Sequence, residues 1–170
     1  LVGQRRVGKS YIMRQLAKNL VLKGVRPENI LMINKEFESY SFIETHKDLD
    51  MFISAYEEKF NPNGRVYIFI DEIQEIEGWE KMVNSYSQDY SKEYELFISG
   101  SNSKMLSSEL STLLSGRYVE FKIFPFSYSE FCDVNNVAGS KQSYLSYMQT
   151  GGLPELVNLN GDETKRNYVS

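Results

Sequence analysis

The first ten residues contain the segment that most constrains the fold of this chain. Residues 3–10 read Gly-Gln-Arg-Arg-Val-Gly-Lys-Ser, which fits the pattern G-x-x-x-x-G-K-S. The two glycines allow a tight loop whose backbone N–H groups turn inward, and the helix that follows presents its positive N-terminal end to the same point. Such a P-loop joins a strand to a helix and cradles the phosphates of a nucleotide, so it predicts both a local fold and a class of ligand.

Individual residues of this loop have distinct expected roles. Lys9 is expected to reach the β- and γ-phosphates, and the Ser10 hydroxyl is expected to bind Mg²⁺. Arg5 and Arg6 place positive charge beside the loop, although both can equally face solvent. The predicted nucleotide contacts are Gly3, Gln4, Arg5, Arg6, Val7, Gly8, Lys9, Ser10 and Tyr11.

Strand and helix signals alternate along the chain. Apolar runs predict strands at residues 30–33, 66–70 and 96–98, and an alternating run predicts another at 118–123. Helical patterns occupy residues 11–23, 42–60, 79–90, 104–114, 127–131 and 142–148. This alternation predicts an α/β fold, a three-layer P-loop NTPase with a mostly parallel central sheet flanked by helices. We expect residues 1–124 to form the core and residues 125–170 a helical extension.

Two acidic residues follow the most apolar of these strands. Residues 66–70 run directly into Asp71 and Glu72, which is the Walker B pattern of an apolar strand that delivers a carboxylate beside a P-loop. Asp71 is expected to hold Mg²⁺ or its waters, and Glu72 to polarise the water that attacks the γ-phosphate. An acidic pair alone could be a solvated strand end or a helix cap, but its combination with the P-loop favours the functional interpretation.

A polar segment, Ser99-Gly100-Ser101-Asn102, follows the next strand. Because right-handed crossovers bring the carboxyl ends of parallel strands to one edge of the sheet, this segment should lie near Asp71 and the P-loop. Ser99, Ser101 and Asn102 are candidates to sense the γ-phosphate or position water, with Ser99 favoured because it comes last on the strand. A polar loop that caps the following helix explains these residues equally well.

Composition narrows the classes of partner and compartment. The net charge of −4 and the pI of about 5.2 are not typical of a domain that binds nucleic acid through its own surface. Cys132 is the only cysteine, so no internal disulfide can form, which is typical of a protein in the reducing cytoplasm. No apolar run has the length of a membrane span, and we expect no membrane association.

Further motifs occur in the order found in one family. After the P-loop come Asp71-Glu72-Ile73-Gln74 with Gly78-Trp79-Glu80, then Ser99-Gly100-Ser101-Asn102, Ser115-Gly116-Arg117, Pro125-Phe126-Ser127-Tyr128-Ser129-Glu130-Phe131 and Gly151-Gly152-Leu153-Pro154-Glu155. Together these motifs extend over nearly the whole chain. The chain thus resembles the AAA+-like ATPases of archaea and bacteria in the STAND-related branch, the AAA_14 type.

This resemblance implies an ASCE-type sheet with strand order 5-1-4-3-2 and ATP as the nucleotide. It also implies a longer parent protein with further C-terminal domains, through which DNA or protein partners could bind, and it leaves self-association open. Only Leu1 and Val2 precede the P-loop, so the first and central strand is expected to be truncated.

Some residues carry two interpretations. Arg117 could act on a γ-phosphate as an arginine finger, in its own subunit or in a neighbour, or could be a surface residue at a strand start. Gln74 could bond near the attacking water or could be a polar residue at a helix start. Trp79 is expected to pack in the core, and His46, the only histidine, to face solvent.

The sequence as a whole predicts Mg²⁺-dependent binding and hydrolysis of ATP, with Lys9, Glu72, Ser99 and Arg117 as the candidate catalytic residues and Ser10 and Asp71 as the metal ligands. A slow nucleotide-gated switch with little turnover is the alternative. A small-molecule kinase is less favoured, because no arginine-rich stretch resembles the lid of such an enzyme.

Overall fold

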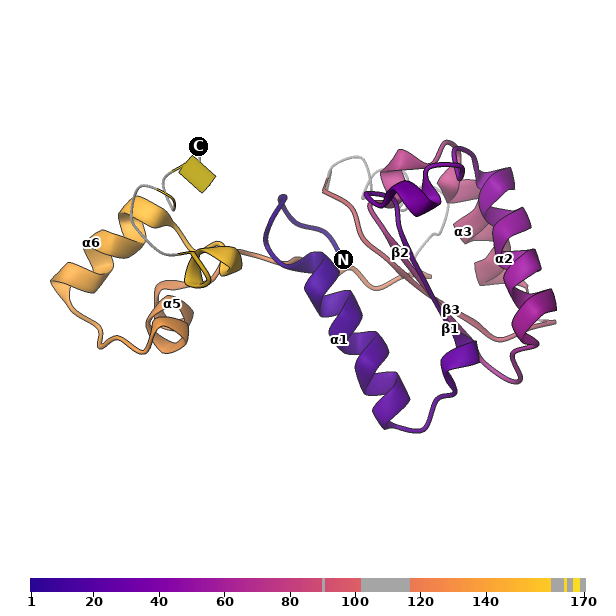
Figure 1. Ribbon diagram of the computed structural model, residues 1–170, viewed down its shortest axis with the longest axis horizontal. Coiled ribbons are helices and arrows are strands. Elements are labelled where there is room, and N and C mark those ends of the chain that lie inside the picture. Colours follow the sequence, from indigo (N-terminus) through magenta and orange to yellow (C-terminus); the bar gives the residue numbers. More distant parts are fainter. Residues whose placement is uncertain (90, 102–116, 160–163, 165–166, 169–170) are drawn as a thin grey trace. The chain divides into compact units, whose positions relative to one another are not determined.

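The computed structural model describes residues 1–170 except 90, 102–116, 160–163, 165–166 and 169–170 (Figure 1). The chain forms two compact units. Unit 1 comprises Leu1–Gly3 and Lys9–Lys122, and unit 2 comprises Gln4–Gly8 and Ile123–Ser170. Each unit is described by itself below.

A parallel sheet forms the centre of unit 1. Strands β1 (Ile30–Asn34), β2 (Val66–Asp71) and β3 (Tyr94–Ile98) lie in the order β1-β2-β3, and all neighbours run parallel. Asn34 lies level with Asp71, and Ile70 lies level with Ile98. The α/β fold with a parallel sheet flanked by helices, predicted from the alternation of strand and helix signals, is therefore confirmed.

Val2 extends this sheet beyond β3. It forms parallel bridges with both Gly100 and Lys122, and the Leu1 ammonium group donates a hydrogen bond of 2.7 Å to the Ile98 carbonyl. The resulting order of Lys122, Val2, β3, β2 and β1 agrees with the 5-1-4-3-2 order that the resemblance implied. The strand predicted at residues 118–123 is wrong in extent: within the described part of the chain it is reduced to the bridge between Lys122 and Val2.

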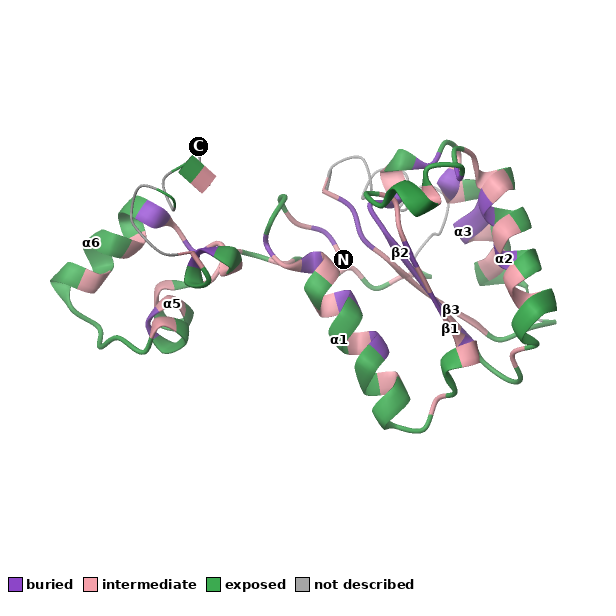
Figure 2. Ribbon diagram, viewed as in Figure 1, coloured by how far each residue is buried: buried purple, intermediate pink, exposed green. Residues whose placement is uncertain are grey.

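Helices cover both faces of the sheet, which explains why β2 is apolar without alternation. Side chains of β2 such as Ile68 and Ile70 pack with α2 (His46–Phe60) and α3 (Trp79–Gln88), and both are fully buried. Phe69 points to the other face, where it packs with Met13 of α1 (Lys9–Leu22) and stacks on Phe97 with ring centroids 4.5 Å apart. Figure 2 shows the purple, buried positions concentrated along this sheet.

Capping side chains set the helix boundaries. Helix α2 begins at His46 rather than at the predicted residue 42, because Thr45 and Asp48 form a capping box that fixes the first turn. The described residues also form the 3₁₀ turns η1 (Pro27–Asn29), η2 (Glu38–Tyr40), η3 (Ile73–Glu75) and η4 (Pro154–Val157). The helix predicted at residues 104–114 lies outside the described residues.

Unit 2 contains α5 (Tyr128–Asn135) and α6 (Lys141–Thr150). The predicted capping box of Ser127 and Glu130 begins α5. The turn after α6 crosses close to residue 126: the Phe126 N–H donates to the Gly152 carbonyl at 2.7 Å, and a Cβ at position 152 would lie 2.1 Å from the Phe126 carbonyl oxygen. Only glycine fits there, which gives a physical reason for glycine in the Gly-Gly-Leu-Pro motif.

None of the described helices has both the length and the apolar character that crossing a membrane requires.

Candidate functional site

Four buried polar residues of unit 1 form one connected cluster, which we call the strand-end cluster. It consists of Lys9, Asp71, Glu72 and Ser99, with exposed fractions of 4%, 4%, 7% and 0%. Charged side chains are almost never fully buried unless they are paired, because removing a charge from water is costly. Three buried charges lie close together here, with Lys9 3.9 Å from Glu72 and Asp71 joined to Glu72 in the chain and through Ser99, and they mark this point as a candidate site.

Strand register brings the cluster together. Asp71 is the last residue of β2, and Ser99 follows β3 directly. The Ser99 hydroxyl donates to Asp71 Oδ1, and Asn34 Nδ2 donates to Asp71 Oδ2 at 3.3 Å. The sequence indicates that Asn34, Lys35 and Glu36 end the strand predicted at residues 30–33 and could approach the site, but Asn34 is not among the residues selected as site residues. Its signal was its place as the polar residue that ends β1, at the same level as Asp71.

Glu72 has an unusual backbone conformation. Its φ and ψ are 55° and 51°, in the left-handed region that residues with a side chain seldom adopt. This turn takes the chain from β2 into η3, and it is supported by Ser99, whose hydroxyl accepts from the Glu72 N–H at 3.4 Å and whose carbonyl accepts from the Ile73 N–H at 3.0 Å. Backbone strain of this kind costs about 1–3 kcal/mol and concentrates at functional sites.

Lys9 connects the P-loop to the acidic residues. Its ammonium group donates to the Gly3 carbonyl at 2.9 Å and lies 3.9 Å from Glu72 Oε1. The residue predicted to bind phosphates and the residue predicted to activate water thus contact each other. With Asp71 included, the three charges sum to one net negative charge, which suits a site for a divalent cation.

The oxygen donors of unit 1 fit Mg²⁺ bound together with a nucleotide. Asp71 supplies a buried carboxylate, and Ser10, half-buried in the first turn of α1, supplies a hydroxyl. Mg²⁺ usually binds through one or two carboxylates, with phosphate oxygens and waters completing its octahedron. Among the described residues there is no group of three or more His, Cys, Asp or Glu that could hold a metal by itself.

The middle of the P-loop, Gln4–Gly8, belongs to unit 2. Gln4, Arg5 and Arg6 are exposed and Val7 is buried. Arg6 donates to the Tyr168 carbonyl at 2.5 Å, and its guanidinium lies 4.3 Å from the centre of the Tyr168 ring. Arg6 is therefore engaged by a protein group rather than facing solvent alone.

Gly8 and Tyr11 are two further residues predicted to contact the nucleotide. Gly8 has a φ of 96°, a conformation that glycine adopts without strain, so the second glycine of the motif has a backbone role. Tyr11, on the first turn of α1, is 64% exposed.

The next predicted residues are Ser99 and Ser101, which follow β3, and Arg117. Ser99 uses its hydroxyl on Asp71, and Ser101 accepts a hydrogen bond from Gln74 at 3.4 Å. Arg117 is exposed, and within the described part of the chain no hydrogen bond or ion pair joins it to the strand-end cluster. Asn102 lies outside the described residues, as do Ser115 and Gly116 before Arg117. Trp79 is 2% exposed in the core, as expected for a packing residue.

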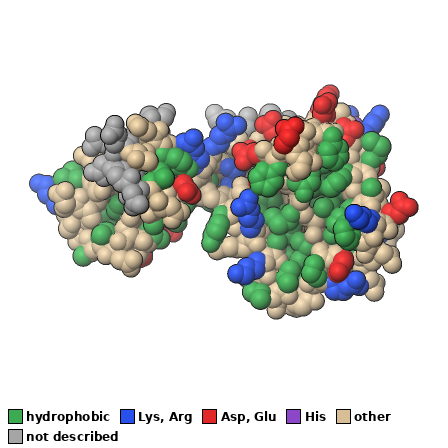
Figure 3. All heavy atoms as spheres, viewed as in Figure 1, with side chains coloured by type: hydrophobic (Ala, Val, Ile, Leu, Met, Phe, Trp, Pro, Cys, Tyr) green, Lys and Arg blue, Asp and Glu red, His purple; other side chains and the backbone are tan. Residues whose placement is uncertain are grey.

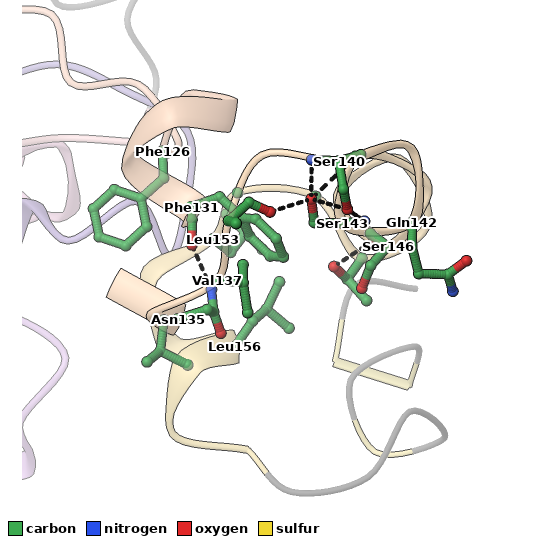
Figure 4. Close-up of a pocket in the computed structure, with 15 residues that line it drawn as sticks. Phe126, Phe131, Asn135, Val137, Ser140, Gln142, Ser143, Ser146, Leu153 and Leu156 are labelled. Atoms are coloured by element: carbon green, nitrogen blue, oxygen red, sulfur yellow. Dashed lines mark hydrogen bonds between the residues drawn. The ribbon is translucent and has the colours of Figure 1, made fainter. Parts of the chain in front are cut away.

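Unit 2 contains a cavity of about 570 Å³ between α5, α6 and η4 (Figure 4). Its walls are mostly apolar and include Phe126, Phe131, Val137, Leu153 and Leu156. The serines at its rim are already bonded, because Ser140 and Ser143 form the capping box of α6. The lining contains no His, Cys, Asp, Glu, Lys or Arg, so it offers no acid–base chemistry of its own.

The face drawn in Figure 3 has a mixed charge pattern. On the face drawn in Figure 3, basic side chains lie scattered among acidic and hydrophobic ones, in keeping with the net charge of −4. This arrangement differs from the clustered basic stripe of domains that bind nucleic acid directly.

Comparisons with known proteins give the following matches. A family model described as an AAA domain matches residues 1–132. An uncharacterized protein of Haemophilus influenzae is 39% identical over 159 residues, which cover 91% of this chain and 39% of that protein. Uncharacterized protein MJ1544 of Methanocaldococcus jannaschii is 29% identical over 180 residues, which cover 99% of this chain and 38% of that protein. The chain therefore spans about two fifths of the length of these relatives.

Proposed function

This chain belongs to the AAA domain family of nucleotide-binding ATPases, and on that premise we propose that it binds ATP with Mg²⁺ and hydrolyses it. The observation that carries the proposal is the strand-end cluster, in which a buried P-loop lysine contacts Glu72, and the buried Asp71 precedes Glu72 at the edge of a parallel sheet. Ligands of open α/β sheets bind at this edge.

The P-loop and the cations beside it would bind the triphosphate. Backbone N–H groups of residues 3–8 and the N-terminal end of α1 supply donors, and Lys9 moves from Glu72 to the β- and γ-phosphates. Arg5 and Arg6 add positive charge to the same loop. When bound, Mg²⁺ neutralises charge on the β- and γ-phosphate oxygens, and Ser10 and Asp71 are the residues that would hold it.

Glu72 would act as the general base. Its carboxylate accepts a proton from water as the water oxygen attacks the γ-phosphorus, while the bond from that phosphorus to the bridging oxygen of ADP breaks. The products are ADP, phosphate and the proton that Glu72 releases. Ser99 and Asn34 keep the Asp71 carboxylate oriented through their hydrogen bonds.

One observation favours the second candidate function, a nucleotide-gated switch with slow turnover. Glu72 Oε1 faces Lys9 and Glu72 Oε2 accepts a hydrogen bond from Gln74, so both carboxylate oxygens are engaged. The base becomes available to water only when Lys9 leaves. A switch predicts tight ATP binding with turnover far below about 1 s⁻¹, the lower end of ordinary enzyme rates.

Steady-state ATPase assays of the wild type and Glu72→Gln test the proposal. General-base catalysis contributes about 10²–10⁴-fold, so the variant should lose turnover by that factor while retaining ATP binding. Glu75→Gln is the matched control, since Glu75 is an exposed carboxylate on the same 3₁₀ turn and should leave turnover unchanged. Equal rates for Glu72→Gln and wild type would show that Glu72 is not the base.

The output of ATP turnover would lie in parts of the protein beyond this chain. Because the chain spans about two fifths of its relatives, we propose that hydrolysis drives or gates attached domains and acts on a DNA or protein partner through them. Self-association would allow Arg117 to reach the γ-phosphate of a neighbouring subunit. Assays of the full-length protein with and without DNA test the coupling to a DNA partner. Measurement of its mass in solution tests self-association, and cell fractionation tests the cytoplasmic location that we also propose.

A further inference from the structure

Gln74 makes contacts that the roles described so far do not use. It lies in η3, and its side chain turns back toward the strand ends rather than capping that turn. Gln74 Nε2 donates to Glu72 Oε2 at 2.5 Å and to Ser101 Oγ at 3.4 Å. Both partners belong to the segments that follow β2 and β3, so this amide joins the proposed base to the neighbouring strand end.

The orientation of the amide indicates which contact dominates. Gln74 Oε1 is buried and has no hydrogen-bond partner among the described residues, an arrangement that costs free energy. Turning the amide over would place that oxygen against a carboxylate, which can only accept hydrogen bonds when ionised. In the observed orientation Gln74 donates to Glu72, and its own Oε1 is left without a hydrogen bond among the described residues.

The remaining restraint on the Glu72 carboxylate is temporary under the proposed function. Lys9, 3.9 Å from Oε1, is the group that the triphosphate would draw away. Gln74 is not expected to bind phosphate, and its hydrogen bond to Glu72 Oε2 would remain when Lys9 moves away. One oxygen of the base would then stay fixed while the other becomes available to water.

We infer that Gln74 is a positioning residue for ATP hydrolysis: it holds Oε2 of Glu72 so that Oε1 is presented to the attacking water. The inference rests on the proposed function of Glu72 as the base. Orientation of a reacting group governs rate strongly, because misplacement by about 1 Å can cost about 10²-fold. A residue that acts in this way changes kcat and leaves the affinity for ATP unchanged.

Two variants of the full chain test this role. Gln74→Met keeps the length of the side chain and removes the donor, and Gln74→Glu keeps its shape but replaces the donor by an acceptor. We expect both to lower kcat by about 10- to 100-fold. For Gln74→Met we expect the Kd for ATP to stay at the wild-type value. The unfolding midpoint reported by Trp79 fluorescence should fall by about 4–8 °C at most, which corresponds to the loss of one hydrogen bond to a charged group. Gln88→Met is the matched control, because Gln88 is exposed on α3 and should affect none of these quantities.

The outcomes separate three cases. A wild-type kcat in Gln74→Met overturns the inference and leaves the proposed function intact. In Gln74→Met, a fall in kcat that is matched by a loss of ATP affinity, or by a fall in the unfolding midpoint larger than one lost hydrogen bond explains, shows a structural role and also overturns it. A wild-type protein that binds ATP without hydrolysing it refutes the proposed function itself, and the inference falls with it.

Discussion

Replacing Ser99 by alanine should destabilise unit 1, because its hydroxyl supports a buried carboxylate. Ser99 is fully buried and its hydroxyl donates to Asp71 Oδ1, while the Ser99 hydroxyl oxygen accepts from the Glu72 N–H at 3.4 Å. The alanine variant leaves the polypeptide path unchanged and deletes one small polar atom. What it removes is the donor that reaches Oδ1 from the neighbouring strand end.

The size of the effect follows from these contacts. Hydrogen bonds to charged groups contribute about 1.5–3 kcal/mol, and the longer bond from the Glu72 N–H adds little. We therefore expect Ser99→Ala to lower the free energy of unfolding by about 2 kcal/mol. For a chain of this size, about 1 kcal/mol lowers Tm by about 2–4 °C, so the expected shift is about 4–8 °C.

Tryptophan fluorescence reports the unfolding of unit 1, the part of the chain that contains Ser99. Trp79 is the only tryptophan, and it lies buried in the core of unit 1. Thermal and urea unfolding followed by its emission should give the same difference between variant and wild type. Ser87→Ala is the control: this serine is exposed, donates only to the Asn84 carbonyl, and should change stability by less than about 0.5 kcal/mol.

The alternative role of Ser99 predicts a different result. If its hydroxyl senses the γ-phosphate, Ser99→Ala should weaken ATP binding relative to ADP binding and leave the unfolding midpoint unchanged. If the hydroxyl supports Asp71 instead, Ser99→Ala should lower the unfolding midpoint. A midpoint within error of wild type would refute the assignment of Ser99 to the Asp71 carboxylate.

Two further predictions concern one contact inside unit 2 and one inside unit 1. Gly152→Ala should destabilise unit 2 by about 3 kcal/mol or more, because the new Cβ would lie 2.1 Å from the Phe126 carbonyl oxygen. Limited proteolysis measures this loss of stability. Gly139→Ala is the control, because its Cβ would make only an ordinary contact, and this variant should resist cleavage like the wild type. Thr45→Ala should cost about 1 kcal/mol at neutral pH by removing the N-cap of α2. The Thr45 hydroxyl lowers the pKa of Asp48, so this bond stabilises the fold above the ordinary pKa and its contribution is lost as pH falls through the folded-state pKa. Urea unfolding at neutral and acidic pH should therefore show a smaller effect of Thr45→Ala in acid.

The features that sequence predicted well are those that short-range chemistry determines. The unbroken apolar run at residues 66–70 is a strand buried on both faces, and the Ser127 capping box begins α5. Asp71 and Glu72 could be predicted as site residues because the apolar run just before them determines where the strand ends. Each of these signals lies within a few residues of the feature it predicts.

The features that sequence missed depend on contacts between distant segments. Asn34 belongs to the site because the register of β1 against β2 places it level with Asp71. Residues 118–123 alternate in polarity, but they form only a bridge because Val2 is their partner in the sheet. The left-handed backbone of Glu72 has no local signal such as glycine, since Ser99, which follows β3, supports it.

The contact between Lys9 and Glu72 explains how ligand binding and activation could be the same event. A single carboxylate at 3.9 Å competes poorly for an ammonium group against a triphosphate with several negative charges, so ATP should separate the pair and release Oε1 of the base. ADP lacks the γ-phosphate and would leave more of the pair intact. On this reasoning Glu72→Gln, which removes the competing charge, should bind ATP as tightly as the wild type or more tightly. Titration of both proteins with ATP decides the point, because weaker binding by the variant would mean that Glu72 assists the nucleotide rather than competing with it for Lys9.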